Sequence, residues 1–187
     1  MSMHVFRQAL KLAGNYGEDV ALGGGEPTLH PYFEKMLLLA IAAPKKDKAF
    51  IVTNGSIKER AMMLYQLASQ NVIYAKLSYD QFHNLEMVDD EVIEAYKAAS
   101  WLWGPPLGQD EPFMATRKLS NRGRARQFKE AVDYCACEDW IVKPDGKVYQ
   151  CGCEDAPQIG DVWGRISGPG KMCCHFIEVE DNHELIP

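Results

Sequence analysis

The chain has no cysteine in its first 134 residues, and all six of its cysteines fall between Cys135 and Cys174. It also lacks an apolar run of membrane-spanning length, because the run MLLLAIAA at residues 36–43 ends at Pro44. Its N-terminal residues do not show the basic-then-apolar order of a secretory signal peptide. The sequence therefore predicts a cytoplasmic protein, in which cysteines serve as metal ligands or thiols rather than in disulfides.

An excess of positive charge is also missing. The net charge is −6 at pH 7, and the basic segment RKLSNRGRAR at residues 117–126 is more typical of a solvated face than of an anion site. The phosphate-binding motif GxxxxGK followed by serine or threonine does not occur, and neither does a serine nucleophile elbow. We therefore expect neither nucleic acid nor a membrane among the partners.

The residues that are present indicate a soluble globular protein with one domain, or with one domain and a small appendage. Of its 187 residues, 47% are apolar and 25% are charged. Apolar spacing predicts helices, the first one capped by Ser2, at residues 2–15, 31–43, 58–70 and 89–100. Buried strands are predicted at residues 19–22, 49–56 and 72–80, with one more in 113–120 after a loop-like stretch at 101–112. This alternation predicts a parallel sheet and an α/β fold.

Polar or glycine residues lie at the carboxyl ends of the three predicted strands. The segments are Gly-Gly-Gly-Glu-Pro at 23–27, Thr-Asn-Gly-Ser at 53–56 and Ser-Tyr-Asp at 78–80. Ligands of parallel α/β sheets bind at the carboxyl ends of the strands, where these segments would gather. Three successive glycines allow a close approach to the main chain, although an ordinary tight turn would also explain them.

The motifs GGEPTLHP, VTNGS, LSYD and NRGRA follow one another at residues 24–31, 52–56, 77–80 and 121–125. They resemble the radical S-adenosylmethionine superfamily, in the order in which that family shows them, and the likeness extends over residues 1–165. The resemblance implies a partial parallel βα barrel of four to five strands with outer helices in residues 1–129. It also implies that the main chain of Gly24, Gly25 and Glu26 receives the amino group of S-adenosylmethionine. Ser78 and Asp80 would face its ribose or carboxylate.

The C-terminal part is rich in cysteine and glycine and contains a predicted hairpin with its turn at residues 144–146. Thiolates at hairpin ends can build a sulfur site for an iron–sulfur cluster or for Zn²⁺, whereas partly buried free thiols are the alternative. The strongest candidate ligands are Cys135, Cys151 and Cys153, and the competing ones are Cys137, Cys173 and Cys174. We therefore predict a small metal-binding β-hairpin region at residues 130–187.

The spacing of this region also resembles a known auxiliary-cluster domain. Ten residues separate Cys135 from Gly146, and four separate Gly146 from Cys151. This pattern is similar to the SPASM or twitch domain that follows the barrel in many radical S-adenosylmethionine enzymes. The resemblance implies a 4Fe-4S cluster at the C-terminal cysteines.

The chain departs from the family in one respect that concerns function. The family binds its catalytic cluster with a CxxxCxxC loop before the first helix, and no cysteine occurs there in this chain. Iron requires thiolates to hold such a cluster, so we expect weak S-adenosylmethionine binding and no cleavage by this chain alone. We expect either a degenerate relative or a sequence that starts at an internal methionine of a longer enzyme acting on a peptide or small molecule. The alternative is a non-catalytic binding module that a metal stabilises.

Single histidines and tryptophans carry weaker signals. His83 lies in the segment expected at the ligand side and is a candidate for substrate contact, whereas His30 is expected at the start of the second helix. The tryptophans are expected in the core or at a domain junction: Trp101, Trp103, Trp140 and Trp163.

Overall fold

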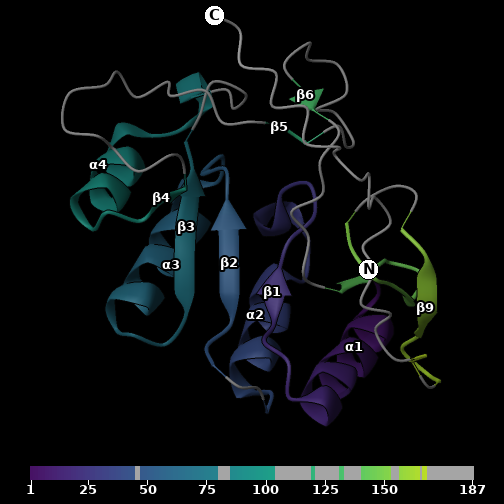
Figure 1. Ribbon diagram of the computed structural model, residues 1–187. Coiled ribbons are helices and arrows are strands. Elements are labelled where there is room, and N and C mark those ends of the chain that lie inside the picture. Colours follow the sequence, from purple (N-terminus) through teal and green to yellow (C-terminus); the bar gives the residue numbers. More distant parts are fainter. Residues whose placement is uncertain are drawn as a thin grey trace, which may run out of the picture. The chain divides into compact units, whose positions relative to one another are not determined.

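The computed structural model describes residues 1–44, 47–79, 85–103, 119–120, 131–132, 140–152, 156–164 and 166–167. The chain divides into two compact units (Figure 1), which we call the first unit, Ser2–Arg117, and the second unit, Lys118–Pro187 together with Met1. The predicted domain boundary between residues 129 and 130 lies outside the described residues and stays a prediction.

Helices and strands alternate along the first unit. The strands are β1 (Ala21–Leu22), β2 (Phe50–Thr53), β3 (Tyr74–Ser78) and β4 (Leu102–Trp103), paired in parallel in the order β1-β2-β3-β4. The α-helices are α1 (Met3–Tyr16), α2 (Phe33–Ala42), α3 (Lys58–Ser69) and α4 (Asp90–Ala98), and the 3₁₀-helices are η1 (Pro27–Leu29) and η2 (Leu85–Met87). The predicted α/β class with a parallel sheet is confirmed, and the described strands do not close into a barrel.

The core of the first unit forms on one face of this sheet. Ile51 pairs in register with Ala75, and Thr53 with Leu77, and all four residues are buried. The alternate residues of both strands are half-buried or exposed, as expected because successive side chains point to opposite faces. Figure 1 shows α2 and α3 on the same side of the sheet. The helices add the buried residues Phe6, Leu10, Phe33, Leu37, Leu64 and Tyr96.

Helix ends follow local capping chemistry. The Ser2 side chain accepts a hydrogen bond of 3.2 Å from the backbone N–H of Val5, so the predicted cap of the first helix is confirmed. Gly17 ends this helix in the left-handed conformation, with φ of 67°. Asp89 caps α4 by accepting from the N–H of Glu91 at 3.0 Å. None of the helices in the described part of the chain combines the length and apolar character needed to span a bilayer.

Two local expectations differ from the structure. The second helix begins at Phe33 instead of residue 31, because residues 27–29 form the separate 3₁₀-helix η1 with Glu26 as its cap. The stretch 101–112 was expected to be loop-like, but its residues Leu102 and Trp103 form β4 beside β3. A strand of two residues is too short to produce the alternating pattern by which strands are recognised.

The second unit contains two small sheets among its described residues. β5 (Leu119–Ser120) and β6 (Ala131–Val132) pair in parallel, and β5 is the described end of the strand predicted in residues 113–120. β7 (Ile141–Val142), β8 (Lys147–Tyr149) and β9 (Gln158–Asp161) form an antiparallel sheet in the order β7-β8-β9. The predicted C-terminal β-hairpin is therefore confirmed.

The turn of this hairpin requires glycine at position 146. The N–H of Gly146 donates to the carbonyl of Lys143 at 2.9 Å, and its φ is +87°. A Cβ at this position would lie 2.4 Å from the ring of Trp163. The side chain of Trp163 lies against the turn and is 56% exposed, so Trp163 is not a core residue, and its predicted place at a domain junction stays a prediction.

Candidate functional site

The carboxyl ends of the parallel strands lie at one edge of the sheet. Leu22 at the end of β1 pairs in register with Ile51, and Thr53 at the end of β2 pairs with Leu77, one residue before Ser78. The segments that follow these strands therefore start at the same edge. The structure places the predicted residues Gly24, Gly25, Glu26 and Ser78 there, whereas Asp80 and His83 lie outside the described residues.

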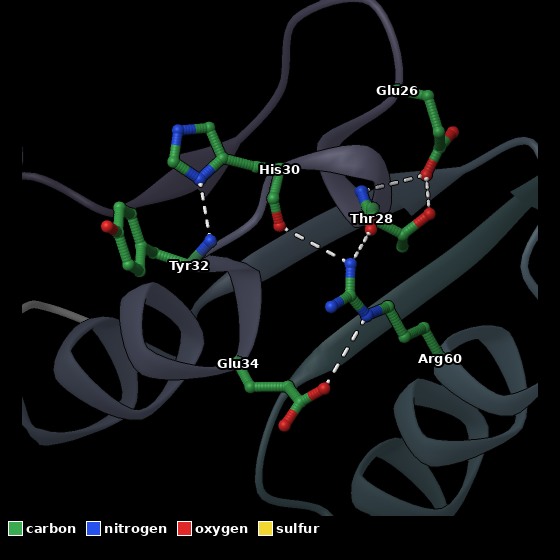
Figure 2. Close-up of polar contacts among 6 residues, drawn as sticks. All are labelled: Glu26, Thr28, His30, Tyr32, Glu34 and Arg60. Carbon is green, nitrogen blue, oxygen red and sulfur yellow. Dashed lines mark hydrogen bonds and ion pairs between the residues drawn. The ribbon is translucent and has the colours of Figure 1, made fainter. Parts of the chain in front are cut away.

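The carboxylate of Glu26 is engaged by four donors within the protein. Its Oε1 accepts from the N–H of Thr28 at 3.0 Å and from the Thr28 hydroxyl at 2.5 Å (Figure 2). The same oxygen accepts from the Thr53 hydroxyl at 2.8 Å, and Oε2 accepts from the N–H of Asn54 at 2.6 Å. The side chain of Glu26 thus fastens the end of the glycine run to the end of β2.

The glycine run has no close neighbours in the part of the chain that the structure describes. Apart from the adjacent residues, a Cβ added at Gly23, Gly24 or Gly25 would meet none of the described atoms within 4 Å. Gly24 has a φ of +138°, which disfavours other residues, but Gly23 and Gly25 do not have such a φ. Neither packing nor the φ angle therefore explains the glycines at positions 23 and 25. Close approach of a ligand to the main chain would explain both.

The segment after β2 is a turn that, besides its contacts with Glu26, has two hydrogen bonds of its own. The Thr53 hydroxyl accepts from the N–H of Gly55 at 3.1 Å, and the Asn54 side-chain oxygen accepts from the N–H of Ser56 at 3.0 Å. Gly55 has a φ of +76°, and a Cβ there would lie 2.8 Å from Leu77. Glycine at position 55 is therefore explained within the protein, in contrast to positions 23 and 25.

Ser56, the last residue of the motif VTNGS, is a polar residue at this edge to which the sequence analysis assigned no role. Its Oγ atom is buried and has no hydrogen-bond partner among the side chains and main chain that the structure describes. A buried hydroxyl without a partner is unfavourable by about 1–3 kcal/mol. A ligand group or an ordered water would remove this cost, which makes Ser56 a candidate contact.

A second set of contacts holds η1 from the side of α3. The Nη1 of Arg60 donates to the carbonyl of Thr28 and, at 3.3 Å, to that of His30 (Figure 2). Its Nε lies 3.5 Å from a carboxylate oxygen of Glu34. His30 closes η1 shortly before α2, as predicted, and its Nδ1 accepts from the N–H of Tyr32 at 3.1 Å. Sequence reasoning missed Arg60, because a side chain that binds main-chain carbonyls leaves no motif.

The buried residue Tyr96 connects α4 to α3, and the charge of Glu26 affects its pKa. Tyr96 of α4 is fully buried, and its hydroxyl donates to the carbonyl of Ala61 in α3 at 3.0 Å. Burial raises the pKa of Tyr96 well above its ordinary value, and the negative charge of Glu26 raises it further. Tyr96 therefore stays neutral and serves as a packing residue rather than as an acid or base.

Of the predicted metal ligands, Cys151 is the one that the structure describes. It is buried, with 1% of its surface exposed, and lies two residues after the end of β8. Cys135, Cys137, Cys153, Cys173 and Cys174 lie outside the described residues. Within the described ranges, no group of three or more His, Cys, Asp or Glu residues could hold a metal ion. The C-terminal metal site therefore remains a prediction.

Comparison with known proteins assigns no relative. No family model matches the chain, and no curated protein or solved structure matches it.

Proposed function

We propose that the chain binds S-adenosylmethionine at the carboxyl edge of its parallel sheet and is a radical S-adenosylmethionine type protein, either part of a longer enzyme or a degenerate relative. The proposal rests on the ordered motifs GGEP, TNGS and LSYD, which follow β1, β2 and β3. In this family S-adenosylmethionine supplies a radical for reactions on peptides or small molecules, either of which is the proposed substrate class. Which substrate it is depends on loops outside the motifs.

The observation that carries the proposal is that Gly23 and Gly25 have no close neighbours in the described part of the chain. A turn with a purely structural role requires glycine where φ is positive or where a neighbouring atom is too close for a Cβ, as at Gly55. Positions 23 and 25 meet neither condition. The contacts of the Glu26 carboxylate with Thr28, Thr53 and Asn54 support the same reading, since they hold the run in place while its main-chain carbonyls receive the amino group of the ligand.

A partial barrel is part of the proposal. Every neighbour in the order β1-β2-β3-β4 is parallel and consecutive, as in a sheet wound in one direction, whereas a doubly wound sheet reverses its order. The further strands of such a barrel, after β4, are part of the proposal.

An iron–sulfur cluster or Zn²⁺ at the C-terminal cysteines completes the proposal. The buried position of Cys151 just after β8 suits a ligand presented from a hairpin end. One observation favours the second candidate function, a non-catalytic binding module that a metal stabilises. No thiolate is present before Cys135 to hold a cluster beside the glycine run.

The binding proposal is tested by titrating the isotope-labelled chain with S-adenosylmethionine and following its backbone amides by NMR. Without iron to chelate the methionine group, we expect a Kd of about 0.1–1 mM, with shifts concentrated at residues 23–26 and at Ser78. The Gly25→Ala variant should fold normally, because its Cβ meets none of the described atoms within 4 Å. It should bind at least about fivefold more weakly, a loss of about 1 kcal/mol.

The matched control is Lys35→Ala on the exposed side of α2, which should bind like the unaltered chain. Equal binding by Gly25→Ala would contradict the proposed main-chain contact. Absence of shifts up to about 10 mM ligand, the limit of weak specific binding, would contradict S-adenosylmethionine as the ligand. A dithionite assay should yield no 5′-deoxyadenosine, and its formation would show that the C-terminal cysteines support catalysis.

A further inference from the structure

Arg60 connects three parts of the polypeptide around the glycine run. It belongs to α3, yet its guanidinium binds two carbonyls of the segment that follows the run, those of Thr28 and His30. It also lies over the ring of Phe33, 5.8 Å from the centroid, and its Nε pairs with Glu34. These contacts join α3 to both η1 and the first turn of α2.

The carbonyl of Thr28 depends on this contact. Thr28 is 0% exposed, so water does not reach it, and a buried carbonyl requires a donor. Arg60 supplies that donor, as Figure 2 shows for the two carbonyls of η1. Arginine suits the task better than lysine, because its planar guanidinium carries several donors in a fixed arrangement.

We propose that Arg60 is a positioning residue for the ligand of the glycine run. It fixes η1 through the carbonyls of Thr28 and His30, and η1 in turn fixes the C-terminal end of the run. This inference rests on the proposed function, because it concerns the same ligand site.

The physical reason is preorganisation. Glycines 23–25 have no side chains that could anchor them, and a Cβ at these positions would meet none of the described residues within 4 Å, so the two ends of the segment are what restrict its conformation. β1 holds the first end by pairing with β2, while Glu26 and Arg60 hold the second. Release of the second end would let the glycines adopt more conformations. A ligand would then have to order them, which lowers its affinity.

The test compares Arg60→Ala and Arg60→Lys with the unaltered chain in two measurements. The first is hydrogen exchange of the amides of Leu29 and His30, which donate to Glu26 and Pro27 within η1. We expect exchange to be at least about tenfold faster in Arg60→Ala, with Arg60→Lys between the two. The second is the S-adenosylmethionine titration, in which we expect at least about fivefold weaker binding by Arg60→Ala.

Arg7→Ala, an exposed arginine on α1, is the matched control and should change neither measurement. Unchanged exchange in Arg60→Ala would overturn the anchoring of η1, whether or not a ligand binds. Faster exchange with unchanged affinity would overturn the positioning role. If the unaltered chain did not bind S-adenosylmethionine, the proposed function would be wrong. The proposed role of Arg60 in ligand binding would then be wrong as well. The exchange rates would still show separately whether Arg60 anchors η1.

Discussion

Replacing Glu26 with glutamine tests whether its carboxylate holds the edge of the sheet together. The change keeps the size and shape of the side chain but converts one acceptor oxygen into an NH₂ donor. If the amide oxygen takes the place of Oε1, it keeps the hydroxyl of Thr53 and the two donors of Thr28. The NH₂ group then faces the N–H of Asn54, which now donates to Oε2 at 2.6 Å.

The expected cost follows from these contacts. A hydrogen bond to a charged group contributes about 1.5–3 kcal/mol, and here it is replaced by two donors that face each other. The remaining bonds also lose the assistance of the negative charge, so we expect a total destabilisation of about 2–4 kcal/mol. The opposite amide orientation also leaves one pair of donors facing each other, because the N–H of Thr28 would face the NH₂ group, whereas the two threonine hydroxyls can accept from it.

Amide hydrogen exchange in the first unit measures this effect locally. The amides of Asn54 and Thr28 should exchange at least about 30-fold faster in Glu26→Gln, which corresponds to about 2 kcal/mol. The control is Glu94→Gln on α4, where an exposed carboxylate lies 3.5 Å from Lys97 and the change should stay within about 0.5 kcal/mol. Equal exchange in both variants would refute the view that Glu26 fastens the glycine run to β2.

Three further predictions concern other parts of the chain. Gly55→Ala should destabilise the first unit by about 1–3 kcal/mol in urea unfolding, since the alanine would combine strain at φ +76° with a contact of 2.9 Å to Val88. The pKa of buried Tyr96 is raised in the folded state, so its contribution to stability is fully present at pH values below its unfolded pKa near 10.0. This stability should decrease as pH rises above that value, by about 1.4 kcal/mol per unit, and Tyr96→Phe should remove the decrease. Anaerobic reconstitution should load iron or zinc on the chain, and Cys151→Ser with Cys153→Ser should lower the metal content, whereas absence of metal in the unaltered chain would contradict the C-terminal site.

The sequence predicts the scaffold of the first unit well because its strands are short apolar runs between amphipathic helices. Runs such as 49–56 and 72–80 contain β2 and β3, and the glycines and serines after them mark the edge where the strands end. Helix starts with a side-chain cap, such as Ser2, were also predictable, because the cap and its partner are three residues apart. These features depend on neighbours in the sequence.

The contacts that shape the site were not predictable in the same way. Glu26 and Asn54 are 28 residues apart, and Arg60 is 32 residues from Thr28. Arg60 binds carbonyls, which every residue has, so no residue type at position 28 or 30 indicates the pairing. Contacts of this kind arise only when the parallel register places one βα unit beside the next.

The glycines at the carboxyl edge fall into two groups, one that the fold requires and one that it does not. Gly55 is needed by the fold, since its φ is positive and Leu77 and Val88 occupy the space where a Cβ would lie. At Gly23 and Gly25 a Cβ would meet none of the described residues within 4 Å and φ is not positive, so the described part of the fold would accept alanine at both positions. Alanine would also reduce the conformational freedom of the unfolded chain and thereby stabilise the protein slightly. Glycine at these two positions therefore makes the protein slightly less stable than alanine would. Binding of a ligand to the main chain, at the place where the strand ends converge, explains why glycine is present there.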